Sequence, residues 1–109
     1  MFNAKLIRDK LGLSVQMLTP DLADQLNLPS TEGLLIAGVD RDSPASAVGL
    51  RRGHVILAVD GQAPDNLIAA ARILYGKKKG EKVPLDILVQ RQEGVFLIHQ
   101  RVSVELATR

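Results

Sequence analysis

The sequence predicts a mostly β domain of the α+β class, with five or six short antiparallel strands in a partly open barrel capped by two helices. Glycine and proline recur at short, regular intervals, and the candidate strands follow one another about every ten residues. That spacing favours a small barrel over a parallel, doubly wound sheet. A chain of 109 residues is long enough for one domain with its own core, and not for two.

The first predicted strand and helix follow each other directly. Residues 11–18 alternate apolar and polar side chains with a period of two, which is typical of a half-buried strand. Thr19 is a suitable N-cap with Pro20 in the first helical position, and this short helix is expected to stop before Pro29.

The middle of the chain repeats this arrangement. Residues 33–39 read as a buried strand, and Ser43 then caps a second short helix that Gly49 ends. A third strand is expected over residues 54–59, and Asp60-Gly61 predicts a tight turn directly after it.

The last third holds the strongest helical pattern. Apolar residues recur at helical spacing across residues 65–75, and Gly76 is expected to end this helix. Two alternating runs follow, over residues 83–89 and 95–104, and residues 91–94 between them predict a hairpin. No internal repeat, linker or low-complexity tract interrupts the chain.

Composition excludes several classes of function. The absence of cysteine excludes disulfides, thiolate zinc sites and a cysteine nucleophile, and the net charge is only +2. With 3% aromatic residues there is no stacking surface for nucleic acid, and the lysine run at 77–79 reads as a solvated turn. The longest apolar run is too short to span a membrane, and no export signal is visible at the N-terminus.

Catalytic chemistry is not predicted either. The two histidines, His54 and His99, lie in predicted strands without metal-ligand spacing, and no serine stands in a Gly-x-Ser-x-Gly sequence. No glycine-rich phosphate loop is present. We therefore expect no catalytic residues, no metal site and no cofactor.

One polar feature remains, at the start of the first strand. Gly12 stands between Leu11 and Leu13, which allows backbone N–H groups to converge into a small anion-binding nest. The cations Arg8 and Lys10 would favour a carboxylate there. On these residues alone, a plain turn leading into a strand is the favoured interpretation.

Residues 38–61 resemble the central signature of PDZ domains. The signature consists of a Ser-Pro-Ala short helix, a Gly-Leu pair, a Gly-x-x-Ile strand and an Asp-Gly turn. The order of elements is similar to the bacterial, circularly permuted PDZ domains of HtrA-type serine proteases, which begin with Leu-Gly-Ile or Leu-Gly-Val and continue with Thr-Pro-x-Leu-Ala. Both motifs match, and the resemblance covers residues 8–106 of the single domain at 1–109. His54 departs from the family, which usually has Asp there.

The resemblance implies a peptide-binding site that works by β-strand addition. The terminal carboxylate of a partner would lie on the N–H groups of Leu11, Gly12 and Leu13, supported by Arg8 and Lys10. The peptide would run along the first strand, and the helix over residues 65–75 would form the opposite wall. The implied peptide-binding residues are Leu11, Gly12, Leu13, Ser14, Val15, Gln16, Met17, Leu67, Ala71 and Leu74.

The partners implied are C-terminal peptides or unfolded segments that end in an apolar residue, and a covalently linked protease domain in a larger, extracytoplasmic protein. The domain itself would be a non-catalytic module, without nucleic-acid binding or membrane insertion. The alternative is an assembly module of a secretion or site-2 metalloprotease protein, with the groove filled by its own chain or a neighbouring copy.

Overall fold

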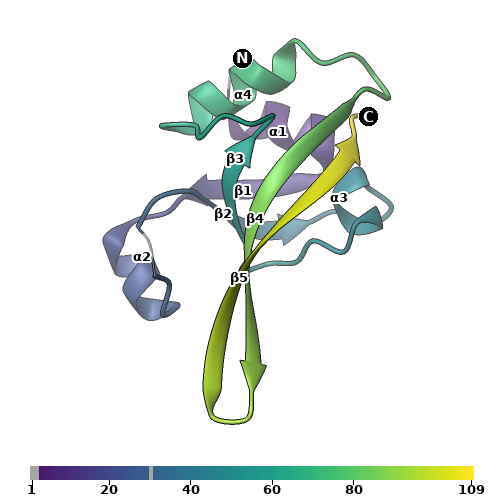
Figure 1. Cartoon of the computed structure of the whole chain (residues 1–109). Coiled ribbons are helices and arrows are strands. Elements are labelled where there is room, and N and C mark those ends of the chain that lie inside the picture. Colours follow the sequence, from purple (N-terminus) through teal and green to yellow (C-terminus); the bar gives the residue numbers. More distant parts are fainter. Residues whose placement is uncertain (1–2, 30) are drawn as a thin grey trace.

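The computed structural model describes residues 3–29 and 31–109 as one antiparallel sheet with helices at its ends and sides (Figure 1). The helices are α1 (Ala4–Leu11), α2 (Pro20–Gln25), α3 (Pro44–Ala47) and α4 (Leu67–Tyr75). The strands are β1 (Leu13–Met17), β2 (Leu34–Val39), β3 (Val55–Val59), β4 (Lys82–Glu93) and β5 (Phe96–Ala107).

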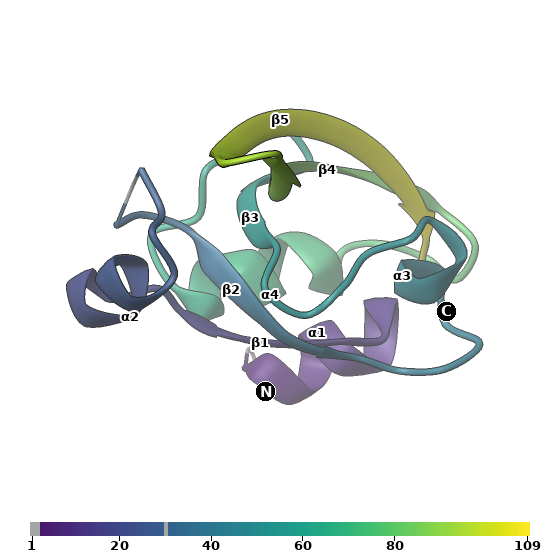
Figure 2. The ribbon, with the colours of Figure 1, turned by 90° about the horizontal axis from the view of Figure 1, so that it is seen from below.

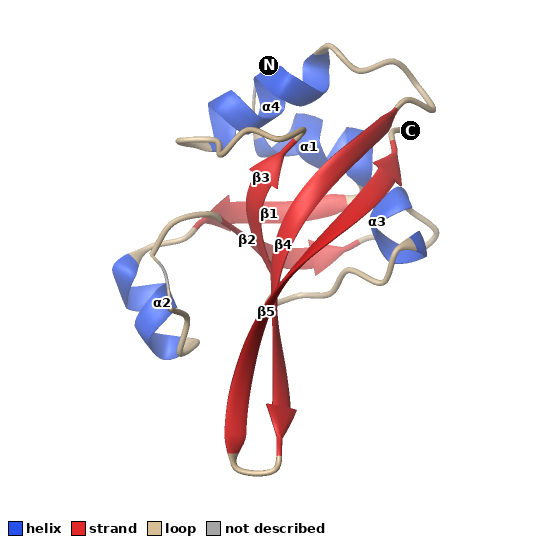
Figure 3. Ribbon diagram, viewed as in Figure 1, coloured by secondary structure: helices blue, strands red, loops and turns tan. Residues whose placement is uncertain are grey.

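The strands pair in sequence order, β1-β2-β3-β4-β5, so that β1 and β5 are the two edges of the sheet. The pairing of β1 with β2 contains an irregularity, because Ser14 lies opposite Gly38 while Val15 lies opposite Ile36. The hairpin of β4 and β5 is long, and its outer half projects from the body of the molecule (Figure 3). Val95, Phe96 and Leu97 lie exposed at its tip.

The helices occupy different sides of this sheet. In Figure 1, α1 lies between α4 and β1, and α2 and α3 lie at opposite ends of β1 and β2. Viewed at right angles, α1 lies on the side of β1 that is opposite to β2 (Figure 2). The edge of the sheet at β1 is therefore covered by α1, and α4 packs on the far side of α1.

Most of the core lies between the sheet and this helix pair. Ile7 and Leu11 of α1 are buried in the same cluster as Ala71 and Leu74 of α4 and the inward side chains of β1 to β4. A smaller cluster, which contains Leu18, Ala23, Leu35 and Val55, holds α2 against the other face of the sheet. The core thus depends on α1 as well as on the strands.

The α+β fold class expected from the sequence is confirmed, together with its caps and turns. The side chains of Thr19, Ser43 and Asn66 accept hydrogen bonds from the first turns of α2, α3 and α4. Asp60 and Gly61 both have positive φ, 53° and 78°, which is the geometry of the expected tight turn.

Two expectations about element boundaries are wrong. No helix is expected before the first strand, and that strand is expected to begin at Leu11, whereas Leu11 is the last residue of α1. Asn3 caps α1, and Ile7 and Leu11 supply an apolar i, i+4 pair that is buried against the core. The strands of the hairpin are also longer than expected, because cross-strand pairing continues to Glu93 and Phe96.

None of the helices in the described part of the chain has the length and apolar character needed to cross a lipid bilayer.

Candidate functional site

The edge strand β1 is the first part of the site. Leu18 N–H donates to Gly33 C=O, and Gly12 C=O accepts from Asp40 N–H, so the backbone groups of even-numbered residues face β2. Because backbone groups alternate along a strand, those of Leu13, Val15 and Met17 face away from the sheet. These groups are the ones that an added strand would pair with.

The side chains of β1 follow the expected alternation. Leu13 and Val15 are buried in the core, while Ser14 is half-buried, Gln16 is exposed and Met17 is half-buried. The apolar side chains therefore fasten β1 to the core, and its role in binding would rest on its backbone.

Helix α4 is the second part of the site. Ala71 and Leu74 are fully buried, and Leu67 is partly buried against the same cluster. The three residues lie on one side of the helix, as their spacing predicts, and Leu11 and Ile7 of α1 belong to that cluster. The structure thus brings the predicted residues of β1 and α4 together around one apolar core, with α1 included.

The corner at Leu11-Gly12-Leu13 is more constrained than the sequence suggests. Gly12 is the C-cap of α1 at φ +81°, and its N–H donates to Arg8 C=O at 2.8 Å. A Cβ at Gly12 would overlap the side chain of Ser43. A side chain at position 12, as in Gly12→Val, would therefore force this corner apart.

The two cations expected to support a carboxylate are engaged within the chain. Arg8 pairs with Asp40 at 3.2 Å, and Arg109 pairs with the same carboxylate at 2.9 Å. The hydrogen bonds from these two guanidinium groups lower the pKa of Asp40. Lys10 Nζ donates to Lys77 C=O at 2.7 Å, which joins the end of α1 to the chain after α4.

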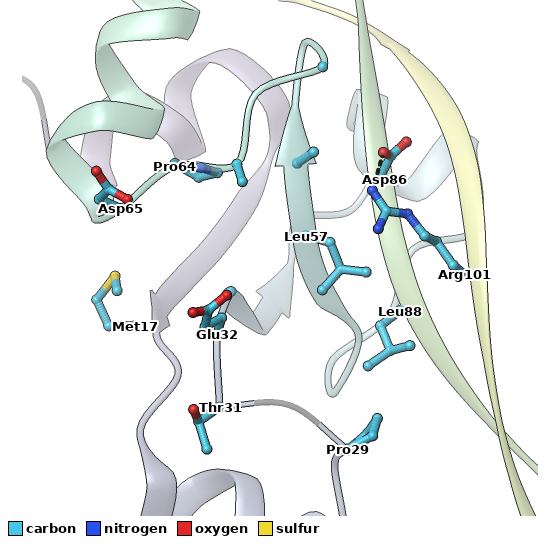
Figure 4. Close-up of a pocket in the computed structure, with 14 residues that line it drawn as sticks. Met17, Pro29, Thr31, Glu32, Leu57, Pro64, Asp65, Asp86, Leu88 and Arg101 are labelled. Carbon is cyan, nitrogen blue, oxygen red and sulfur yellow. Dashed lines mark hydrogen bonds and ion pairs between the residues drawn. The ribbon is translucent and has the colours of Figure 1, made fainter.

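A cavity of about 650 Å³ opens at the far end of β1. Figure 4 shows Met17, at the end of β1, on one side of it, with Pro64 and Asp65, just before α4, above. Leu57 and Leu88 give it an apolar wall, and Arg101 pairs with Asp86 at 2.7 Å beside them. The cavity therefore continues the line of the β1–α4 site beyond Met17.

His54, the departure from the family pattern, takes part in the turn before β3. Its Nδ1 accepts a hydrogen bond from Arg51 N–H at 3.3 Å, as a carboxylate oxygen could. Partial burial and the neighbouring charge of Arg51 lower the pKa of His54 below its usual 6.5. A neutral imidazole is therefore the form that suits this turn.

The lysine run is only partly a solvated turn. Lys77 Nζ lies 2.8 Å from a carboxylate oxygen of Asp60, and these contacts raise the pKa of Lys77. Lys78 and Lys79 are exposed. Among residues 3–29 and 31–109, no three His, Asp or Glu side chains are grouped so as to hold a metal ion.

Comparison with known proteins decides the family. Residues 35–89 match the sequence model described as "PDZ domain", which is half of the chain. The chain belongs to the PDZ domain family. A "Probable periplasmic serine endoprotease DegP-like" from Halomonas elongata is 38% identical over 81 residues of this PDZ domain. The match covers 74% of the chain and 17% of that protease, so the PDZ domain spans about a sixth of the relative's length.

Solved structures agree with this assignment. The "HtrA-type protease AlgW with decapeptide" matches 91% of the PDZ domain with a TM-score of 0.69 and 33% identity, and 29% of that protease chain is covered. The "HtrA3 PDZ Domain Bound to a Phage-Derived Ligand (FGRWV)" has the same TM-score over 91% of the chain and 84% of its own. At 18% identity, the second likeness concerns the fold alone.

Proposed function

We propose that this PDZ domain binds the C-terminal segment of a polypeptide as an added antiparallel strand along β1, opposite α4. The observation that supports this most directly is the edge position of β1, whose odd-numbered backbone groups face away from β2. Leu67, Ala71 and Leu74 would line the opposite wall, with no fixed charge among them. An apolar last residue would therefore be preferred, because burying an ionised one costs desolvation energy.

The direction of the ligand follows from the geometry of the strand. An antiparallel peptide whose carboxylate lies near Leu11, Gly12 and Leu13 has its earlier residues beside Met17. Those residues would reach the cavity at that end of the site. Ser14, Val15 and Gln16 would contribute mainly as the middle of the receiving strand.

The biological role that fits is substrate tethering or regulation in a larger HtrA-type serine protease of the periplasm or cell envelope. Relatives that are similar to this sequence are described as proteases of this type, and the domain would add recognition without catalytic residues of its own. An assembly module that uses the groove for self-association is not favoured by these comparisons.

Two peptides that differ only in the C-terminal group test the binding mode. Fluorescein-labelled decapeptides that end in valine, as the free acid or the amide, are titrated into the domain and followed by fluorescence anisotropy. Amidation removes the charge and places N–H groups against donors, so we expect affinity to fall at least about tenfold, or 1.4 kcal/mol. Equal affinity for the two peptides would contradict recognition of a terminal carboxylate.

A further inference from the structure

Helix α1 occupies the place along β1 where the proposed ligand would bind. It lies on the side of β1 opposite β2 and beside α4, as both views show (Figures 1 and 2). The chain reverses at Gly12, so α1 runs back along β1, and its C-terminal end lies at the corner expected to hold the carboxylate.

The apolar face of α1 fills the space between the two walls. Ile7 and Leu11 are each 1% exposed, and they share a buried cluster with Ala71 and Leu74, the predicted liners on α4. In this arrangement Ala71 is 0% exposed and Leu74 is 1% exposed. A peptide side chain could reach these two residues only after Ile7 and Leu11 had moved.

The backbone polar groups at the C-terminal end of α1 already form hydrogen bonds within the chain. Gly12 N–H donates to Arg8 C=O, and Leu11 belongs to the helix, so two of the three predicted donors serve α1. The guanidinium of Arg109 donates to the carbonyl groups of Arg8 and Asp9, each at 3.1 Å. The end of α1 is thus closed by bonds that a bound carboxylate would have to replace.

Helix α1 can nevertheless undock while the sheet stays folded. A helix of eight residues has little stability of its own and depends on its docking. Its outer face carries the exposed pair Lys5 and Asp9. Its polar ties to the body gather at its C-terminal end, where the side chains of Arg8 and Lys10 bond to Asp40 and Lys77, and where Arg109 bonds to backbone carbonyls of residues 8–10. Local undocking of such an element requires less free energy than global unfolding.

We propose that α1 is an internal competitor for the peptide site, so that a ligand binds only to molecules in which α1 has undocked from β1 and α4. The inference rests on the proposed function, since it concerns the same groove. Apparent affinity is then the intrinsic affinity multiplied by the undocked fraction. Weakening α1 must therefore strengthen peptide binding, which is the opposite of what a purely structural helix would show.

The test uses substitutions in α1 that leave the groove residues untouched. Asn3 caps the helix through its bond to Leu6 N–H, and Lys5 is exposed, so Asn3→Ala with Lys5→Gly weakens α1 alone. Each change is worth about fivefold in the helix equilibrium. The matched control weakens α2 in the same way, with Thr19→Ala at its cap and Gln25→Gly on its exposed surface.

The free-acid decapeptide ending in valine is titrated into both double variants and the parent. We expect the α1 variant to bind at least about tenfold more tightly than the parent, and the α2 variant to bind like the parent. Peptide binding that is equal or weaker in the α1 variant overturns the competitor role while the proposed function stands. Failure of all three proteins to bind overturns the proposed function, and this inference with it.

Discussion

Gly12 is the residue on which both the turn and the site depend. It has the left-handed φ of +81° that closes α1, and it lies against Ser43 at the start of α3. The sequence motif indicates the position correctly, but a single sequence does not show that a distant residue packs against it. The contact with Ser43 follows only from the fold.

The energetic cost of crowding Ser43 can be measured by comparing substitutions at two glycines that have the same φ. Gly49 also has φ +81°, but no atom lies within 4 Å of where its Cβ would be. Gly49→Ala should cost about 1–2 kcal/mol for the left-handed backbone alone. Gly12→Ala should cost at least about 1 kcal/mol more, because the added atom overlaps Ser43. Urea unfolding of both variants gives the difference, and equal losses would mean that Ser43 yields without cost.

His54 makes stability depend on pH. Its pKa is lowered in the folded protein, so the unfolded chain binds the proton at a higher pH than the folded one does. The contribution of His54 is therefore fully present above about pH 6.5 and is lost as the pH falls through the folded pKa.

The substitution His54→Asn isolates this effect. The asparagine side-chain oxygen can accept the bond from Arg51 N–H, but it does not titrate in this range. Thermal melts at pH 7.5 and 5.5 should show a smaller loss of stability at the lower pH in the variant than in the parent. An unchanged pH dependence would show that His54 is protonated equally easily in both states.

At the scale of elements, the hairpin of β4 and β5 divides into an inner half that belongs to the core and an outer half that does not. Ile87 is fully buried, whereas Phe96 at the tip is 69% exposed. Gln90 Nε2 donates to Leu26 C=O at 2.7 Å, which ties the middle of the hairpin to the body of the domain.

Substitutions in the two halves should differ clearly. Ile87→Ala should lower the free energy of unfolding by about 2–5 kcal/mol, because it leaves a cavity in the core. Phe96→Ser should change it by no more than about 0.5 kcal/mol. Chemical denaturation measures both. A large loss for Phe96→Ser would mean that the tip packs against another part of the molecule.

Sequence patterns predicted the elements with local signals and missed those decided by packing. Thr19, Ser43 and the Asp60-Gly61 turn carry their geometry in their own side chains or backbone preferences, and all were predicted correctly. Helix α1 has a short amphipathic pattern that becomes clear only once Ile7 and Leu11 have a surface to pack on. The hairpin exceeds its predicted length because cross-strand pairing extends it beyond the apolar residues.

For the whole molecule, the family could be read from the motifs, while the packing around the proposed site could not. The predicted residues of β1 and α4 do face a common space, and nothing in their own sequence indicates that α1 fills it. The ion pair of Arg8 could not be predicted from the sequence either, because its partner Asp40 lies 32 positions further along the chain. Contacts between distant residues decide both points.

If a C-terminal peptide binds along β1 in exchange for α1, amide hydrogen exchange must change in opposite directions on these two elements. Exchange is followed by NMR at residues 8–10 of α1 and at Leu13 and Val15 of β1, with and without the free-acid decapeptide. Replacement of α1 by the peptide predicts lower protection at residues 8–10 and higher protection at Leu13 and Val15 when peptide is bound. A bound peptide that leaves α1 fully protected, or that fails to protect these β1 amides, would contradict it.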